Sequence, residues 1–91
     1  MAQEIWHAPD PRNFRILREI MRIIRDAADS RRVEMRRGGG WGDPQFTFKL
    51  GGEKIVMTVL LVESMILVGN QVFFGLHLPQ GLPGVLESLK K

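Results

Sequence analysis

Residues 54–62 read KIVMTVLLV, and this stretch decides the fold because it carries apolar side chains on both faces of an extended strand. Alternate side chains of a strand point to opposite faces of a sheet. Thr58 is the only polar side chain between the two sets, which are Ile55, Met57, Val59 and Leu61 on one face and Val56, Leu60 and Val62 on the other. A strand with one wet face would alternate apolar and polar residues. Both faces of this strand therefore need a cover.

One long helix is predicted over residues 10–29. Asp10 can accept hydrogen bonds from the first turn, and Pro11 fits the first helical position. Apolar residues then recur at spacings of three and four, which gives the helix one core-facing stripe: Ile16, Leu17, Ile20, Ile23, Ile24 and Ala27.

The sheet is predicted over residues 31–78. Period-two alternation marks strands around Val33 and Met35 and from Gln45 to Leu50, and Gly51-Gly52 is a two-residue hairpin signal. A turn near residues 63–64 is expected to separate residues 54–62 from residues 65–68, with one long strand or a short helix as the alternatives. Gly69-Asn70 marks a further tight turn, before an alternating strand that runs to Leu78.

These elements predict one domain over residues 1–91, of the α+β class. An N-terminal arm (1–9) precedes the long helix, which packs on a four- or five-stranded antiparallel sheet in two layers, and residues 83–90 form a short C-terminal helix. Five strands make a sheet about 20–24 Å wide, whereas a helix is about 10 Å across. We expect the two helices to cover one face and to leave the other open.

Catalytic and metal chemistry have little support in the sequence. There is no Cys, and His7 and His77 have neither a neighbouring nucleophile pattern nor the spacing of a metal-ligand set. The glycines of residues 38–42 match no phosphate-binding motif. We therefore expect no enzyme activity, no cofactor and no metal. The chain shows no secretory signal and no membrane span, so we expect a cytoplasmic protein.

The positive charge is regional. Residues 12–37 hold nine Arg against four acidic residues, whereas residues 51–91 balance to zero. The helical Arg residues lie within one turn of acids, which favours a solvated and ion-paired face. The better candidate nucleic-acid surface consists of Arg31, Arg32, Arg36, Arg37, Trp41 and Lys49. An edge strand that charge protects from aggregation accounts for the same residues.

The leading hypothesis is a protein–protein assembly module, by default a homodimer, that acts as a small regulator or inhibitor by binding itself or another protein. Burying apolar side chains is worth about 1.5–3 kcal/mol each, whereas an exposed helical ion pair contributes tenths of a kcal/mol. The predicted interface consists of one face of residues 54–62 together with residues 65–68, and the residues named for it are Val56, Leu60, Val62, Ile66, Phe73, Trp6 and Trp41. Nucleic-acid binding through the basic surface is the alternative.

Overall fold

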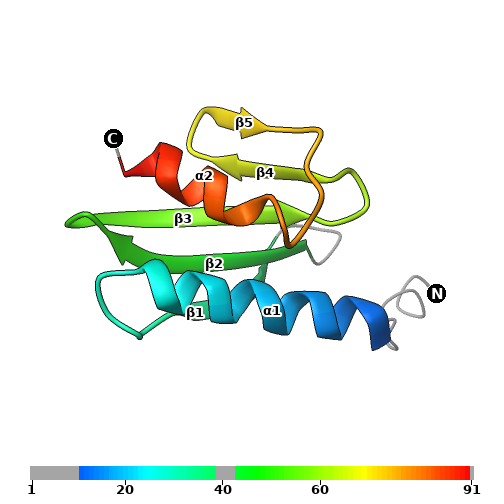
Figure 1. The fold of residues 1–91 in the computed structure, drawn as a ribbon, viewed down its shortest axis with the longest axis horizontal. Helices are drawn as coiled ribbons and strands as arrows, with labels where there is room; N and C mark the ends of the chain where they lie inside the picture. The colour runs from blue at the N-terminus through cyan, green and yellow to red at the C-terminus, as the bar shows by residue number, and fades with distance from the viewer. Residues whose placement is uncertain (1–10, 39–42, 91) are drawn as a thin grey trace.

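The computed structural model describes the backbone of residues 11–38 and 43–90, and the side chains of residues 15–36 and 43–90. Its elements follow the order α1 (Pro11–Ala27), β1 (Glu34–Gly38), β2 (Asp43–Leu50), β3 (Glu53–Leu60), β4 (Met65–Val68), β5 (Gln71–Phe73) and α2 (Leu82–Leu89) (Figure 1). The predicted N-terminal arm, the Asp10 cap, Trp6 and Trp41 lie outside the described residues.

The five strands form one sheet in which each strand pairs antiparallel with the next along the chain, in the order β1-β2-β3-β4-β5. Turns of two, four and two residues join β2 to β3, β3 to β4 and β4 to β5. At the β2–β3 turn, Gly51 and Gly52 have φ of +62° and +85°, which are the left-handed values that the glycine pair predicts. The α+β class with a long N-terminal helix, an antiparallel sheet and a short C-terminal helix is confirmed.

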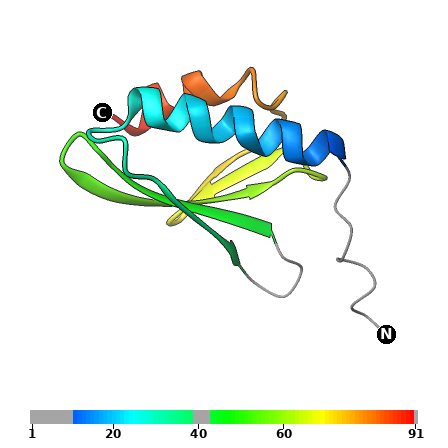
Figure 2. The ribbon, with the colours of Figure 1, turned by 90° about the horizontal axis from the view of Figure 1, so that it is seen from below.

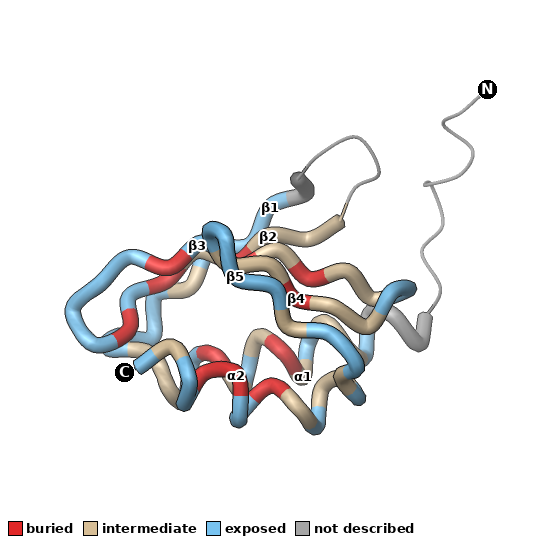
Figure 3. Tube along the Cα trace, turned by 90° about the horizontal axis from the view of Figure 1, so that it is seen from above, coloured by how far each residue is buried: buried red, intermediate tan, exposed pale blue. Residues whose placement is uncertain are grey.

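Both helices lie on the same face of the sheet (Figure 2). The core fills the space between the two layers, and Figure 3 shows the buried positions on the sides of the helices and strands that face each other. The strands supply Phe46, Phe48, Leu50, Ile55, Met57, Val59 and Ile66, and the helices supply Ile20, Ile24, Leu82, Val85 and Leu86. Ile55, Met57 and Val59 are thus the covered side of β3.

The turn between β3 and β4 is as predicted. It spans residues 61–64, where Ser64 has φ of +57° and donates its N–H to the carbonyl of Leu61 at 3.3 Å.

The long helix ends two residues earlier than predicted, at Ala27, and the chain then turns so that the N–H of Asp29 donates to the carbonyl of Lys49 at 2.8 Å. This contact draws the segment after α1 onto the end of β2.

The last strand is shorter than the sequence predicts, because it ends at Phe73 and not near Leu78. Gly75 has φ of +70°, and the N–H of Leu76 donates to the carbonyl of Ser64 at 3.2 Å, so the chain leaves the sheet there. Leu76 and Leu78 still pack against the core, from the segment that leads to α2. The alternation of apolar residues extends beyond the end of the strand, and for this reason the predicted strand was too long.

Candidate functional site

The candidate site is the face of the sheet that lies opposite the helices, called the open face below. The strand register assigns its side chains, because residues paired across antiparallel strands share a face. Among the described residues, the open face carries Glu34, Arg36, Asp43, Gln45, Thr47, Lys49, Lys54, Val56, Thr58, Leu60, Met65, Leu67 and Val72. No described element packs over it (Figure 2).

Apolar side chains occupy the β3–β5 half of the open face. Val72 and Val56 are 48% and 40% exposed, and Leu60, Met65 and Leu67 are partly exposed. Leu67 pairs with Thr58 on one side and with Val72 on the other, so one row of side chains crosses three strands. Phe74 follows two positions after Val72 and is 73% exposed. This half of the face is apolar and exposed to solvent.

Two of the predicted interface residues are not on this surface. Ile66 is completely buried in the core, and Phe73, its partner on β5, packs against the same core. Their assignment to a docking surface is wrong, because pairing of Val59 with Ile66 puts Ile66 on the helix-covered side. Val56 and Leu60 do lie on the open face, and Val62 is 91% exposed in the adjoining turn. A docking role for these three stays a prediction.

Met65 and Leu67 lie within residues 65–68, which were predicted to join the docking surface, although Ile66 was the residue named there, and Val72 was not predicted at all. The two-residue turn at Gly69-Asn70 pairs Val68 with Gln71, and this register puts Leu67 opposite Val72. Once Ile66 is assigned to the core, its neighbours on β4 must face the other way. The parity of this hairpin was therefore the missing step.

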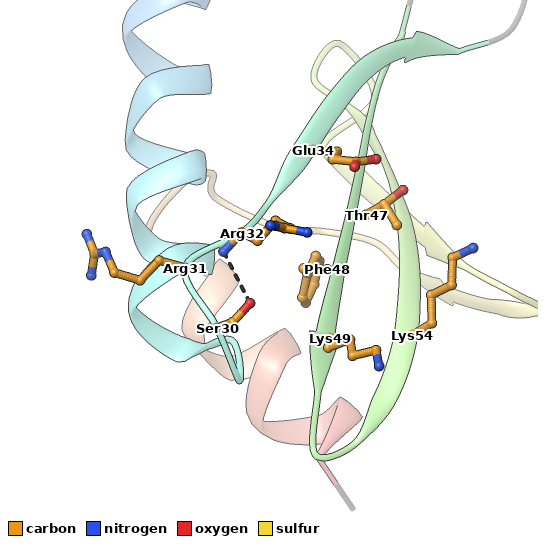
Figure 4. Close-up of a pocket in the computed structure, with 8 residues that line it drawn as sticks. All are labelled: Ser30, Arg31, Arg32, Glu34, Thr47, Phe48, Lys49 and Lys54. Atoms are coloured by element: carbon orange, nitrogen blue, oxygen red, sulfur yellow. Dashed lines mark hydrogen bonds between the residues drawn. The ribbon is translucent and has the colours of Figure 1, made fainter.

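Basic side chains gather at the end of the open face next to the β2–β3 turn. Lys49 and Lys54 lie directly opposite each other on β2 and β3. They line a shallow depression together with Ser30, Arg31, Arg32, Glu34, Thr47 and Phe48 (Figure 4). Arg31 is directed away from the two lysines in Figure 4, and its guanidinium lies 3.8 Å from a carboxylate oxygen of Asp26. Arg32 and the lysines carry the positive charge of the depression.

The predicted nucleic-acid surface is thus brought together in part. Arg32 and Lys49 line the depression, and Arg36 lies on the same face two positions beyond Glu34. The side chains of Arg37 and Trp41 lie outside the described residues. Lys54 is the member that the sequence did not indicate. Its direct pairing with Lys49 follows from the two-residue Gly51-Gly52 turn.

Acidic side chains mark the opposite end of the same face. Asp43 begins β2, and Glu63 lies in the β3–β4 turn. Partial burial raises the pKa of Asp43 above its ordinary value, and the negative charge of Glu63 raises it further. The open face therefore runs from a lysine pair at one end of the strands to a carboxylate pair at the other.

Arg15, Arg18, Arg22 and Arg25 form an arginine ridge along α1, and the predicted ion pairing is found at Arg22. Arg22 lies 2.7 Å from a carboxylate oxygen of Glu19 and 3.5 Å from one of Asp26. The pKa of Arg22 is raised by the hydrogen bond to Glu19 and by the charges of Glu19 and Asp26. Such exposed pairs contribute little to stability, and they neutralise part of the ridge.

The described residues do not bring together a set of side chains around His77 or a group of metal ligands. His77 is exposed beyond the end of β5, and no group of three or more potential metal-ligating side chains occurs within residues 11–38 and 43–90. Neither described helix combines the length and the apolar character that crossing a bilayer requires. No protein-family model, curated protein or solved structure matches this chain.

Proposed function

We propose that this protein is a small assembly module that binds through the open face of its sheet and forms a homodimer. The single observation that carries the proposal is that both described helices lie on one face, while Val56, Leu60, Met65, Leu67 and Val72 lie on the other with no described segment over them. Removing apolar area from water is favourable by about 25 cal/mol per Å², and this gain drives association against its entropic cost. A second sheet is the complementary cover, because two sheets pack face to face about 10 Å apart.

The size of the face suits such an interface. The five strands have five, eight, eight, four and three residues, which at about 3.4 Å per residue and about 4.8 Å between strands makes roughly 450 Å² of flat sheet. Side-chain relief adds to this area, which brings it towards the roughly 600 Å² per partner at the lower end of stable interfaces. The polar β1–β2 side would form part of the rim around an apolar centre.

Light scattering tests the proposal. The wild-type protein should have twice the 10.4 kDa chain mass, at both low and high salt. Val72→Asp should give a folded monomer, because the charge would be desolvated in the interface and not in the free subunit. Met35→Asp is the matched control, since Met35 is 47% exposed against 48% for Val72 but lies on the helix side, where it pairs with Phe46. A wild-type monomer at all concentrations would refute the proposal.

The depression formed by Arg32, Lys49 and Lys54 supports nucleic-acid binding as a second candidate function. Three cationic side chains around one concave surface could contact neighbouring phosphates, and such contacts weaken steeply as salt rises. A monomer that purifies with bound nucleic acid and loses it in high salt would favour this function over assembly. Absorbance at 260 and 280 nm during the light-scattering run separates the two.

A further inference from the structure

The proposed assembly leaves open how the two sheets are oriented, and the charges on the open face bear on this. Lys49 and Lys54 form a like-charge pair at one end of the strands, and Asp43 and Glu63 form one of opposite sign at the other end. On β1, at the polar edge, Glu34 lies towards the lysine end and Arg36 near the middle of the strands. Like charges directly opposite each other on a sheet are destabilising. Each pair would be neutralised by the other pair of a second copy.

We propose that two copies stack their open faces with strands running antiparallel, about a two-fold axis perpendicular to the strands, so that the lysine end of each covers the carboxylate end of its partner. This inference rests on the proposed homodimer and specifies its geometry. Such an axis reverses position along the strands and keeps the order of strands across the sheet. Apolar β3–β5 therefore meets apolar β3–β5.

The alternative axis, parallel to the strands, fails on both counts. It would place the lysine pair of one copy over the lysine pair of the other, and it would bring the polar β1 side over the apolar β5 side. Like-charge contacts between the lysine pairs disfavour that arrangement. The perpendicular axis has one like-charge contact, between the two copies of Arg36 at the polar edge, and matches opposite charges at both ends of the strands.

The register shows which residues would meet. The apolar side chains lie on both sides of the row formed by Thr58, Leu67 and Val72, with Val56 towards the lysine end and Leu60 towards the carboxylate end. With the axis through this row, Leu67 and Val72 face their own copies, and Val56 faces the partner's Leu60. The row continues through Gln45 to Arg36 on β1, so Arg36 also faces its own copy, at the polar edge of the interface. Lys54, two positions beyond Val56, then lies over the turn that contains the partner's Glu63.

Charge exchange tests the electrostatic part. Lys54→Glu would put a carboxylate opposite the partner's Glu63 at two symmetric places, so we expect the dimer dissociation constant to rise by about tenfold or more at low salt. Glu63→Lys should weaken the dimer similarly, and the double exchange Lys54→Glu with Glu63→Lys should return it to near the wild-type value. Dimer affinity that is unchanged in both single variants would overturn the inference.

Cysteine crosslinking tests the axis directly, because the chain has no native Cys. With the perpendicular axis, the two copies of Val72 lie about 10 Å apart, whereas an axis along β3 separates them by about 20 Å. A bismaleimide that spans the shorter distance should therefore join Val72→Cys dimers. Thr58→Cys is the control, since both axes place its two copies close together.

The outcomes separate this inference from the function on which it rests. Crosslinking of both cysteine variants supports the perpendicular axis. Crosslinking of Thr58→Cys alone overturns the proposed orientation and keeps the open-face homodimer. A dimer in which neither variant crosslinks overturns the open face as the interface, and with it both proposals.

Discussion

The carboxylate of Asp29 clasps the β2–β3 turn, where its Oδ2 accepts the N–H of Gly52 at 2.7 Å and its Oδ1 accepts that of Gly51 at 2.9 Å. Both donors belong to glycines with positive φ, whose N–H groups the tight turn leaves free to point outwards. The segment after α1 is thereby joined to the tip of a hairpin more than twenty residues further along the chain. This clasp positions the lysine end of the open face.

Acid should weaken this clasp. The pKa of Asp29 is lowered by the N–H of Gly52, then by that of Gly51, and also by the charges of Lys49 and Lys90. A pKa lower in the folded than in the unfolded chain adds stability above the unfolded pKa, which is lost as pH falls through the folded pKa. Asp29→Asn should therefore lower Tm at pH 7 and reduce the loss of Tm between pH 5 and acid pH, measured by circular dichroism. An unchanged pH profile would contradict a stabilising clasp.

The backbone of the same turn yields a second prediction. Gly52→Ala should destabilise the protein by about 1 kcal/mol, because a Cβ is strained at φ of +85° even though no atom lies within 4 Å of it. Gly84→Ala is the matched control. Gly84 lies in α2, has no positive φ and has equally open space around it. Gly84→Ala should therefore raise the unfolding free energy by about 0.4–1 kcal/mol. Urea unfolding of both variants gives the sign of each change in unfolding free energy. If the two changes had the same sign, the argument from backbone conformation would be contradicted.

A core substitution distinguishes the two sides of β4. Ile66→Ala should cost about 2–5 kcal/mol of unfolding free energy, because Ile66 is completely buried and its neighbours cannot collapse fully into the space. Leu67→Ala, one residue away on the open face, should cost the isolated subunit less and should weaken the dimer instead. Denaturant unfolding at protein concentrations where light scattering shows only monomer measures subunit stability alone, without altering Val72, the cross-strand partner of Leu67. Equal losses at the two positions would contradict the assignment of faces.

Local signals in the sequence were sufficient for most of the fold. The two apolar faces of β3 predict a sheet with one face that the helices cannot cover, and the glycine pair at 51–52 predicts the turn that the structure has. Ile66 was misassigned because parity in a four-residue strand depends on how the preceding turn sets the register. Short apolar strands carry no internal mark of which face is buried.

Contacts distant in sequence were not predictable from local patterns. Asp29 resembles any helix-terminal acid in the sequence, and only the folded chain brings it to Gly51 and Gly52. The early end of β5 likewise depends on the bond between Leu76 and Ser64 and not on side-chain alternation. The ordering of lysines and carboxylates along the open face required the strand register, since Asp43 and Glu63 are twenty positions apart in the chain.

Asp43 should respond to pH with the opposite sign to Asp29. Partial burial and the neighbouring charge of Glu63 raise its pKa in the folded subunit, so ionisation destabilises the fold as pH rises through the ordinary carboxyl range. Asp43→Asn should therefore raise Tm at pH 7 and change it little at pH 3, where the native carboxyl is already protonated. The Val72→Asp background is the one to use, because a partner's lysines would relieve the same repulsion in the dimer. If Asp43→Asn instead lowered Tm at pH 7, the ionised carboxylate of Asp43 would be stabilised by its surroundings. That result would contradict repulsion between Asp43 and Glu63.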